Sequence, residues 1–204
     1  MQILEHDEYL ALRADARVLT RDRYGDKVLA LADGTILKLF RRKRLISSAA
    51  WYPYARRFAD NARALAARGI PCPEVTGLYR LPSVRREAVR YRPLAGKTLR
   101  QLVRAGADAR DLRARLGRFV AGLHQAGIYF RSLHLDNIVL CAGGEFGLID
   151  IADMSAGRRA LSASRRRRNL RHLVRVAEDR AWLRPAGDHA FDEAYRRHAP
   201  ATRW

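Results

Sequence analysis

The sequence predicts an α+β fold in two lobes, a small sheet-rich lobe followed by a mostly helical one. Between residues 17 and 92 the apolar residues form short runs separated by turn residues, a pattern typical of strands. From residue 98 onward they recur at helical spacing instead. The segment 92–96, with Pro93 and Gly96, interrupts both patterns. We therefore expect a first lobe at 1–92 and a second at 93–204, which together form one bilobal domain.

The first lobe is expected to be a small antiparallel sheet with one helix. Asp33-Gly34 separates two apolar runs, and an Asp-Gly pair in this position is the strongest short hairpin signal. Lys38 lies inside the strand that follows this turn. A single apolar stripe predicts a helix over 53–68, which Gly69 ends. The predicted strands cover residues 17–20, 27–32, 35–40, 74–80 and 86–92.

The second lobe is expected to be a reduced, mostly helical lobe that contains one hairpin. A long helix over 108–126 has a continuous apolar face, and Gly127 ends it. The polar segment 130–137 then leads into the hairpin, whose turn is Gly143-Gly144. Further helices are predicted at 98–104, around 170–177 and around 191–195, and the hairpin strands at 138–140 and 146–151.

The chain carries a large positive charge. Its 204 residues include 40 Lys or Arg against 21 Asp or Glu, a formal net charge of +19. Such an excess favours an anionic partner, which is a nucleic acid, an anionic membrane surface or a phosphorylated substrate. Only four of the basic residues are Lys, so a compositional bias towards Arg accounts for the excess equally well. The densest basic runs are 41–44 and 165–168.

Cysteine usage and hydropathy exclude several classes of protein. Cys72 and Cys141 lie too far apart for the paired spacing of a zinc site or a disulfide framework, which favours a reducing compartment. The acidic segment 1–10 lacks the apolar run of a signal peptide, and no stretch approaches the ~18 apolar residues of a membrane-spanning helix. We expect a cytoplasmic monomer, with peripheral contact to the inner membrane as an alternative location.

The segment 123–152 contains the residues that indicate a catalytic or binding function. Residues 130–133, Asn137 and Asp150 follow the order and spacing of the catalytic-loop pattern H-R-D-L-x-x-x-N and of the later D-F-G. The chain thereby resembles the protein-kinase-like superfamily. More narrowly, it resembles the bacterial lipopolysaccharide-core sugar kinases, the Kdo and heptose kinase group, and among them the short members labelled toluene tolerance proteins. The resemblance covers residues 15–180 and includes the motifs at 69–73, 92–96 and 123–127 and the Arg-rich helix near residue 168.

The resemblance implies that ATP and Mg²⁺ are the cofactors. The amide oxygen of Asn137 and the carboxylate of Asp150 are ligand types that Mg²⁺ prefers. Lys38 would supply a fixed positive charge to the α- and β-phosphates. By position, Asn61 and Tyr91 are also assigned to the nucleotide site.

The sequence departs from the kinase pattern at the positions that matter most for catalysis. Ser132 stands where kinases carry the aspartate that accepts the substrate's hydroxyl proton, and a serine is no base at neutral pH without an activating partner. His134 could replace that base or could be a packed histidine, and Asp136 is a further candidate. Asn61 takes the place of the helix glutamate that pairs with the strand lysine. The loop 21–26 has a single glycine, whereas the kinase loop that covers the phosphates has three.

Three functions of different class remain open from the sequence. The first is an ATP-dependent phosphotransferase acting on a lipopolysaccharide-core sugar or related glycolipid at the cytoplasmic membrane face. The second is a pseudokinase, a nucleotide-binding or scaffolding module without turnover. A nucleic-acid-binding protein is the weakest, because the sequence has no basic groove interleaved with aromatic residues.

Overall fold

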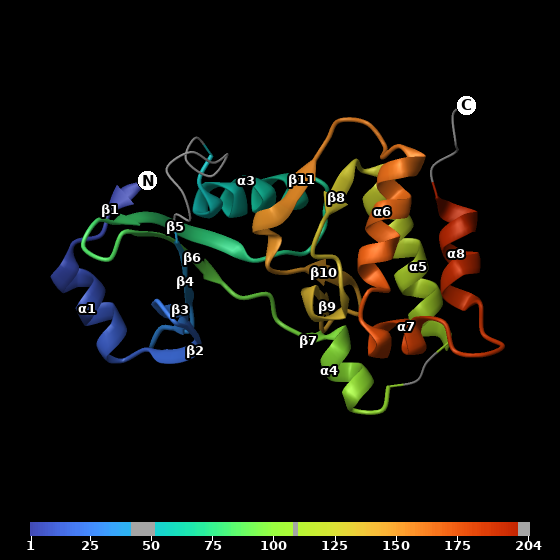
Figure 1. The fold of residues 1–204 in the computed structure, drawn as a ribbon, viewed down its shortest axis with the longest axis horizontal. Coiled ribbons are helices and arrows are strands. Elements are labelled where there is room, and N and C mark those ends of the chain that lie inside the picture. The colour runs from blue at the N-terminus through green and yellow to red at the C-terminus, as the bar shows by residue number, and fades with distance from the viewer. Residues whose placement is uncertain (42–51, 108–109, 200–204) are drawn as a thin grey trace. The chain divides into compact units, whose positions relative to one another are not determined.

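The computed structural model describes residues 1–41, 52–107 and 110–199 of the chain. It confirms the α+β class and divides into two compact units (Figure 1). The first unit is Met1–Leu65 with Cys72–Leu94, and the second is Ala66–Pro71 with Ala95–Trp204. The segment Ala66–Pro71, expected in the first lobe, therefore belongs with the second unit. Its Arg68 donates hydrogen bonds to the carbonyl oxygens of Ala126 and Gly157.

The first unit is built on a six-stranded sheet with the order β1-β5-β6-β4-β3-β2. The Asp-Gly hairpin forms as predicted, with β3 and β4 antiparallel and Val28 opposite Lys38. The short β1 adds a parallel edge to β5, which the sequence analysis did not predict. The strands are β1 (Gln2–Ile3), β2 (Arg17–Asp22), β3 (Gly25–Ala30), β4 (Ile36–Arg41), β5 (Glu74–Leu81) and β6 (Arg86–Arg92).

The described part of the first unit contains two helices, so the expectation of one helix was wrong. α3 (Tyr54–Ala66) is the predicted helix, and its Phe58 ring stacks on Tyr91 of β6 at 5.0 Å between centroids. α1 (His6–Ala14) was missed, and its Tyr9 packs into a buried cluster with Leu37 and Leu39 of β4. Phe40 of the same strand stacks on Tyr54 of α3. Because side chains alternate along a strand, α1 and α3 cover opposite faces of the sheet.

The second unit is mainly helical, as expected. The long helix α5 packs along α8, with Leu116 and Val120 fully buried (Figure 1). The stripe predicted across 170–177 is divided between two helices that break at Val174. The helices are α4 (Leu99–Arg104), α5 (Arg110–Gln125), α6 (Ala163–Leu173), α7 (Ala177–Leu183) and α8 (Ala190–His198). In the described residues, no helix has the length and apolar character needed to span a bilayer.

Two small sheets flank the segment 130–137, which is expected to contain functional residues. β7 (Lys97–Thr98), β9 (Ile138–Leu140) and β10 (Phe146–Leu148) form one, and β8 (Ile128–Phe130) pairs with β11 (Met154–Ala156) in the other. The second hairpin strand ends at Leu148 instead of residue 151, because the chain turns at Asp150 into a short 3-10 helix, Ile151–Asp153.

The close approach of β8 to the segment after β11 depends on Gly127. This residue adopts φ +74°, and a Cβ there would lie 2.5 Å from the carbonyl oxygen of Arg159. Only glycine meets both requirements without strain. Gly127 thus ends α5, as predicted, and also lets the two strands meet.

Candidate functional site

The loop between β8 and β9 is held by two buried leucines. Leu133 and Leu135 are both 0% exposed, whereas Ser132 and His134 are half-buried and alternate with them. The alternation determines which side chains of the loop are buried and which stay partly accessible to solvent. The loop ends in a short 3-10 helix, Leu135–Asn137, which leads directly into β9.

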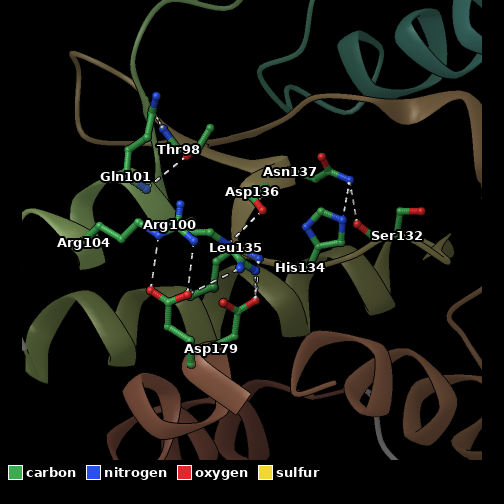
Figure 2. A network of polar contacts seen from close by, with 11 residues as sticks. Thr98, Arg100, Gln101, Arg104, Ser132, His134, Leu135, Asp136, Asn137 and Asp179 are labelled. Atoms are coloured by element: carbon green, nitrogen blue, oxygen red, sulfur yellow. Dashed lines mark hydrogen bonds and ion pairs between the residues drawn. The ribbon is translucent and has the colours of Figure 1, made fainter. Parts of the chain in front are cut away.

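Asn137 organises the polar side of this loop. Its Nδ2 donates to the carbonyl oxygen of Ser132 at 2.8 Å and to Nε2 of His134 at 3.2 Å. Since a carbonyl can only accept, the amide nitrogen must face Ser132, and the orientation of the side chain follows. Figure 2 shows Oδ1 of Asn137 directed away from both partners. An amide oxygen with this orientation is suited to a hard cation such as Mg²⁺.

Asp150 is brought next to Asn137 by the hairpin. β9 and β10 pair antiparallel with Ile138 opposite Leu148, and the backbone N–H of Ile149 donates to the carbonyl oxygen of Asn137 at 3.0 Å. Asp150 follows at the same end of the hairpin, exposed and in the left-handed conformation with φ 54° and ψ 40°. That backbone state is uncommon for a residue other than glycine and clusters at functional sites. An amide oxygen and a carboxylate are donor types that would fit Mg²⁺ together with phosphate oxygens.

Ser132 has a partner that the sequence analysis missed. Its Oγ donates to Oδ2 of Asp153 at 2.6 Å. The other carboxylate oxygen of Asp153, Oδ1, is buried and has no hydrogen-bond partner among the described residues. No local pattern links the two residues, because they are 21 positions apart. They meet where Met154 of β11 pairs with Phe130 of β8.

His134 is poorly arranged for the role of base. Asn137 donates to its Nε2, so this nitrogen is the acceptor of the neutral ring and the proton lies on Nδ1. Nδ1 is buried without a partner in the part of the chain that the structure describes. In this state the ring has no lone pair left for a substrate proton.

Asp136, the other candidate base, is held by an arginine. Its Oδ2 lies 2.8 Å from Nε of Arg100 on α4. Nη2 of Arg100 donates to Oδ2 of Asp179 on α7 at 2.7 Å, and the same oxygen accepts the backbone N–H of Leu135 at 3.3 Å (Figure 2). The ion pairs therefore tie α4 and α7 to the backbone of the loop. They support its position, while the Asp136 side chain, which is 50% exposed, forms an ion pair with Arg100 without a hydrogen bond to Nε.

Asp179 is 0% exposed, and burial raises its pKa above the ordinary value. The N–H of Leu135 and the charge of Arg100 act in the opposite direction. The ion pair with Arg100 at 2.7 Å indicates that the charged form is the one the fold is built around.

A second buried network fixes the start of the loop. Nδ2 of Asn169 on α6 donates to the carbonyl oxygen of Phe130 at 2.5 Å, and Oδ1 faces Nε2 of His124 at 3.2 Å. Nδ1 of His124 then accepts the hydroxyl proton of Tyr195 on α8 at 2.8 Å. Burial lowers the pKa of His124 to about 4, so the ring is neutral. Three helices are thus joined to the residue that precedes the loop.

The remaining candidate residues belong to the first unit. Lys38 and Asn61 are both 7% exposed, on β4 and α3. Nζ of Lys38 lies 5.7 Å from the Phe40 ring, on the face of the sheet that α3 covers. Tyr91 is half-buried against Phe58. A Lys38–Asn61 hydrogen bond stays a prediction, as does the role of each residue at a nucleotide.

The loop expected to cover phosphates is held by Asp22 within it and by Arg86 of β6. The backbone N–H of Tyr24 donates to the Asp22 carboxylate at 2.8 Å, and Nη2 of Arg86 donates to the carbonyl oxygen of Tyr24 at 2.5 Å. Gly25 supplies the positive φ of the turn. The N–H of Tyr24 is therefore already used within the loop.

No family model matches the chain, and no curated protein sequence matches it. Many solved structures match, among them the bifunctional kinase-methyltransferase WbdD, at 17% identity and a TM-score of 0.43. That match covers 72% of this chain and 32% of WbdD, so the chain spans about a third of that protein's length. A likeness at this level carries no argument about chemistry.

Proposed function

We propose that the chain is an Mg²⁺- and ATP-dependent phosphotransferase. The observation that supports it best is the geometry around Asn137, whose amide nitrogen is bound to the loop while its oxygen faces away, with Asp150 at the same hairpin end. This is an arrangement for holding a hard cation, and it occurs in the order that the kinase pattern requires.

Each group of residues has its own role in this proposal. Asn137 and Asp150 would hold Mg²⁺, which supplies charge neutralisation at the phosphates. Leu133 and Leu135 hold the loop in place, and Arg100 fixes it to α4 and α7 through its ion pairs. Lys38, Asn61 and Tyr91 are assigned to the nucleotide by the sequence resemblance alone.

The acceptor is proposed to be a lipopolysaccharide-core sugar or a related glycolipid at the cytoplasmic membrane face. The sequence resemblance supports this choice, and the positive charge of the chain fits an anionic surface. A peripheral location at the inner membrane follows from the same proposal.

A pseudokinase is the second candidate, and Ser132 is the observation that favours it. The position of the usual catalytic carboxylate holds a hydroxyl group. If nothing supplies the missing base, the protein would bind nucleotide without turnover.

Asp150→Ala is expected to abolish Mg²⁺-dependent ATP binding in isothermal titration calorimetry. The substitution removes the carboxylate that we assign to the cation, and circular dichroism checks that the variant, which places alanine at a left-handed position, remains folded. Glu145→Gln is the matched control, since it removes an exposed carboxylate from the opposite end of the same hairpin and should bind ATP normally. Unchanged, Mg²⁺-dependent affinity in Asp150→Ala would refute the metal site.

The basic run 165–168 on α6 is expected to bind anionic lipid through only some of its four arginines. Arg166 is buried, and Arg165 lies over the Tyr129 ring at 5.3 Å, so Arg167 and Arg168 are the most available pair. The run 41–44 lies outside the described residues except for Arg41. Arg167→Gln/Arg168→Gln should weaken binding to phosphatidylserine vesicles by roughly 30-fold at low salt, about 1 kcal/mol per residue.

The control for vesicle binding is Arg196→Gln/Arg197→Gln on α8, which makes the same change in net charge on another exposed surface. Binding should not depend on these residues, and salt should remove the difference between variants. An equal loss in both double variants would mean that net charge alone governs binding.

A further inference from the structure

We propose that Ser132 and Asp153 form a proton relay that supplies the base missing from the catalytic loop. The inference rests on the proposed phosphotransferase function and assigns the proton transfer of that reaction. Ser132 would face the acceptor hydroxyl, and Asp153 would act through Ser132 as the group that orients it and takes up its proton.

The structure builds this pair from two strands. β8 and β11 pair with Phe130 opposite Met154, and each chain then leaves the ladder, β8 forward to Ser132 and β11 back to Asp153. The turn at Asp150 and the 3-10 helix Ile151–Asp153 bring the carboxylate to the loop. A hydroxyl-to-carboxylate distance of 2.6 Å is that of a strong, charge-assisted hydrogen bond.

The carboxylate of Asp153 is only partly satisfied. Oδ2 accepts the Ser132 hydroxyl, while Oδ1 is buried without a partner in the described residues. Buried polar atoms are nearly always paired, and an exception indicates a functional role or an unseen partner. Lone pairs of this carboxylate thus stay available for a proton.

The other candidate bases are already engaged. Nε2 of His134 accepts from Asn137, and Asp136 is paired with Arg100 at 2.8 Å. Of the three candidate bases His134, Asp136 and Asp153, Asp153 is the one whose side chain accepts the hydrogen bond of the Ser132 hydroxyl.

The proposed step balances as follows. The oxygen of the acceptor hydroxyl forms a bond to the γ-phosphorus of ATP as the bond to the β-phosphate oxygen breaks, which releases ADP. The hydroxyl proton passes to Oγ of Ser132, and the proton of Ser132 passes to Oδ2 of Asp153. The products are the phosphorylated acceptor, ADP and a protonated carboxyl group, which later loses its proton to solvent. Serine is thereby activated by an adjacent base, as nucleophilic serines are in other enzymes.

Asp153→Asn tests the relay. The amide oxygen can still accept the Ser132 hydrogen bond, so the loop keeps its support, but the amide cannot take a proton. With MgATP and water as the acceptor, we expect kcat for ATP hydrolysis to fall about 10²–10⁴-fold while KM for ATP changes little. The Kd for MgATP by calorimetry and the midpoint of thermal unfolding should stay at their wild-type values.

The relay also predicts how combined substitutions behave. Ser132→Ala should cost about as much kcat as Asp153→Asn, and the pair Ser132→Ala/Asp153→Asn little more, because the two residues act as a unit. Ser132→Asp alone places a second carboxylate against Asp153, and two such groups do not both stay ionised. Ser132→Asp with Asp153→Asn moves the carboxylate to the loop and should recover the lost activity. Glu145→Gln is again the unaffected control.

The outcomes separate the relay from the function on which it rests. Wild-type protein that binds no MgATP overturns both. Wild-type protein that binds MgATP without hydrolysing it overturns the relay and favours the pseudokinase. Hydrolysis that Asp153→Asn leaves unchanged shows that the hydrogen bond is purely structural, and the relay is then wrong. Failure of a folded, MgATP-binding Ser132→Asp/Asp153→Asn variant to recover activity would contradict the claim that a carboxylate is what the loop lacks.

Discussion

Arg100→Met is expected to lower the free energy of unfolding by about 3–5 kcal/mol, the usual cost of breaking a buried ion pair from one side. The Arg100 side chain is 10% exposed and the Asp179 side chain 1%, so removing the guanidinium leaves a carboxylate in the interior without its cation. The methionine side chain fills most of the same volume, which limits the contribution of a cavity. Urea unfolding followed by circular dichroism measures the change.

The control for Arg100 lies one turn further along the same helix. Arg104 also faces Glu178, at 3.4 Å, but its side chain is 64% exposed. Arg104→Met should therefore cost less than about 1 kcal/mol, as exposed ion pairs do. Adding Asp179→Asn to Arg100→Met should recover part of the loss, because no buried charge then remains unpaired. Equal effects at both arginines would show that the burial of the pair is not what matters.

Acid is expected to destabilise the protein between pH 6.5 and pH 4 through His124. Burial holds the pKa of His124 at about 4 in the fold, against an ordinary value of 6.5. Above pH 6.5 the ring is neutral in both the folded and unfolded chain, and its contribution to stability is fully present. As the pH falls through this window, His124 becomes protonated in the unfolded chain but stays neutral in the folded chain. The free energy of unfolding therefore falls by up to about 3 kcal/mol.

Unfolding measured at a series of pH values tests this expectation. His124→Gln should be less stable at neutral pH, because the bridge between Tyr195 and Asn169 is disturbed, but should lose the part of the pH dependence that His124 causes. His189→Gln, at the exposed start of α8, should keep the full wild-type profile. An unaltered acid slope in His124→Gln would assign the effect to other groups.

The candidate site could be located from the sequence only in part. Ser132, Asn137 and Asp150 could be proposed because their order and spacing along the chain form a recognisable pattern. The helix α1 was missed although it carried a local signal, since Glu8 accepts the backbone N–H of Glu5 three residues earlier in the manner of a capping box. The early turn at Asp150 was missed because an apolar run does not show where a left-handed residue ends it.

The sequence by itself determined most of the elements, since hydrophobic periodicity and turn residues act over a few positions and can be recognised without knowledge of the fold. The Asp33-Gly34 hairpin, the helix after residue 53, the helix α4 and the order of the candidate ligands are all of this kind. Only the tertiary structure decided which polar side chains meet. Asp153 reaches Ser132 across 21 positions, and Asp179 reaches Arg100 across 79, by strand pairing and helix packing that bring distant segments together. These contacts depend on where whole elements lie, and no pattern within a few residues of either partner encodes them.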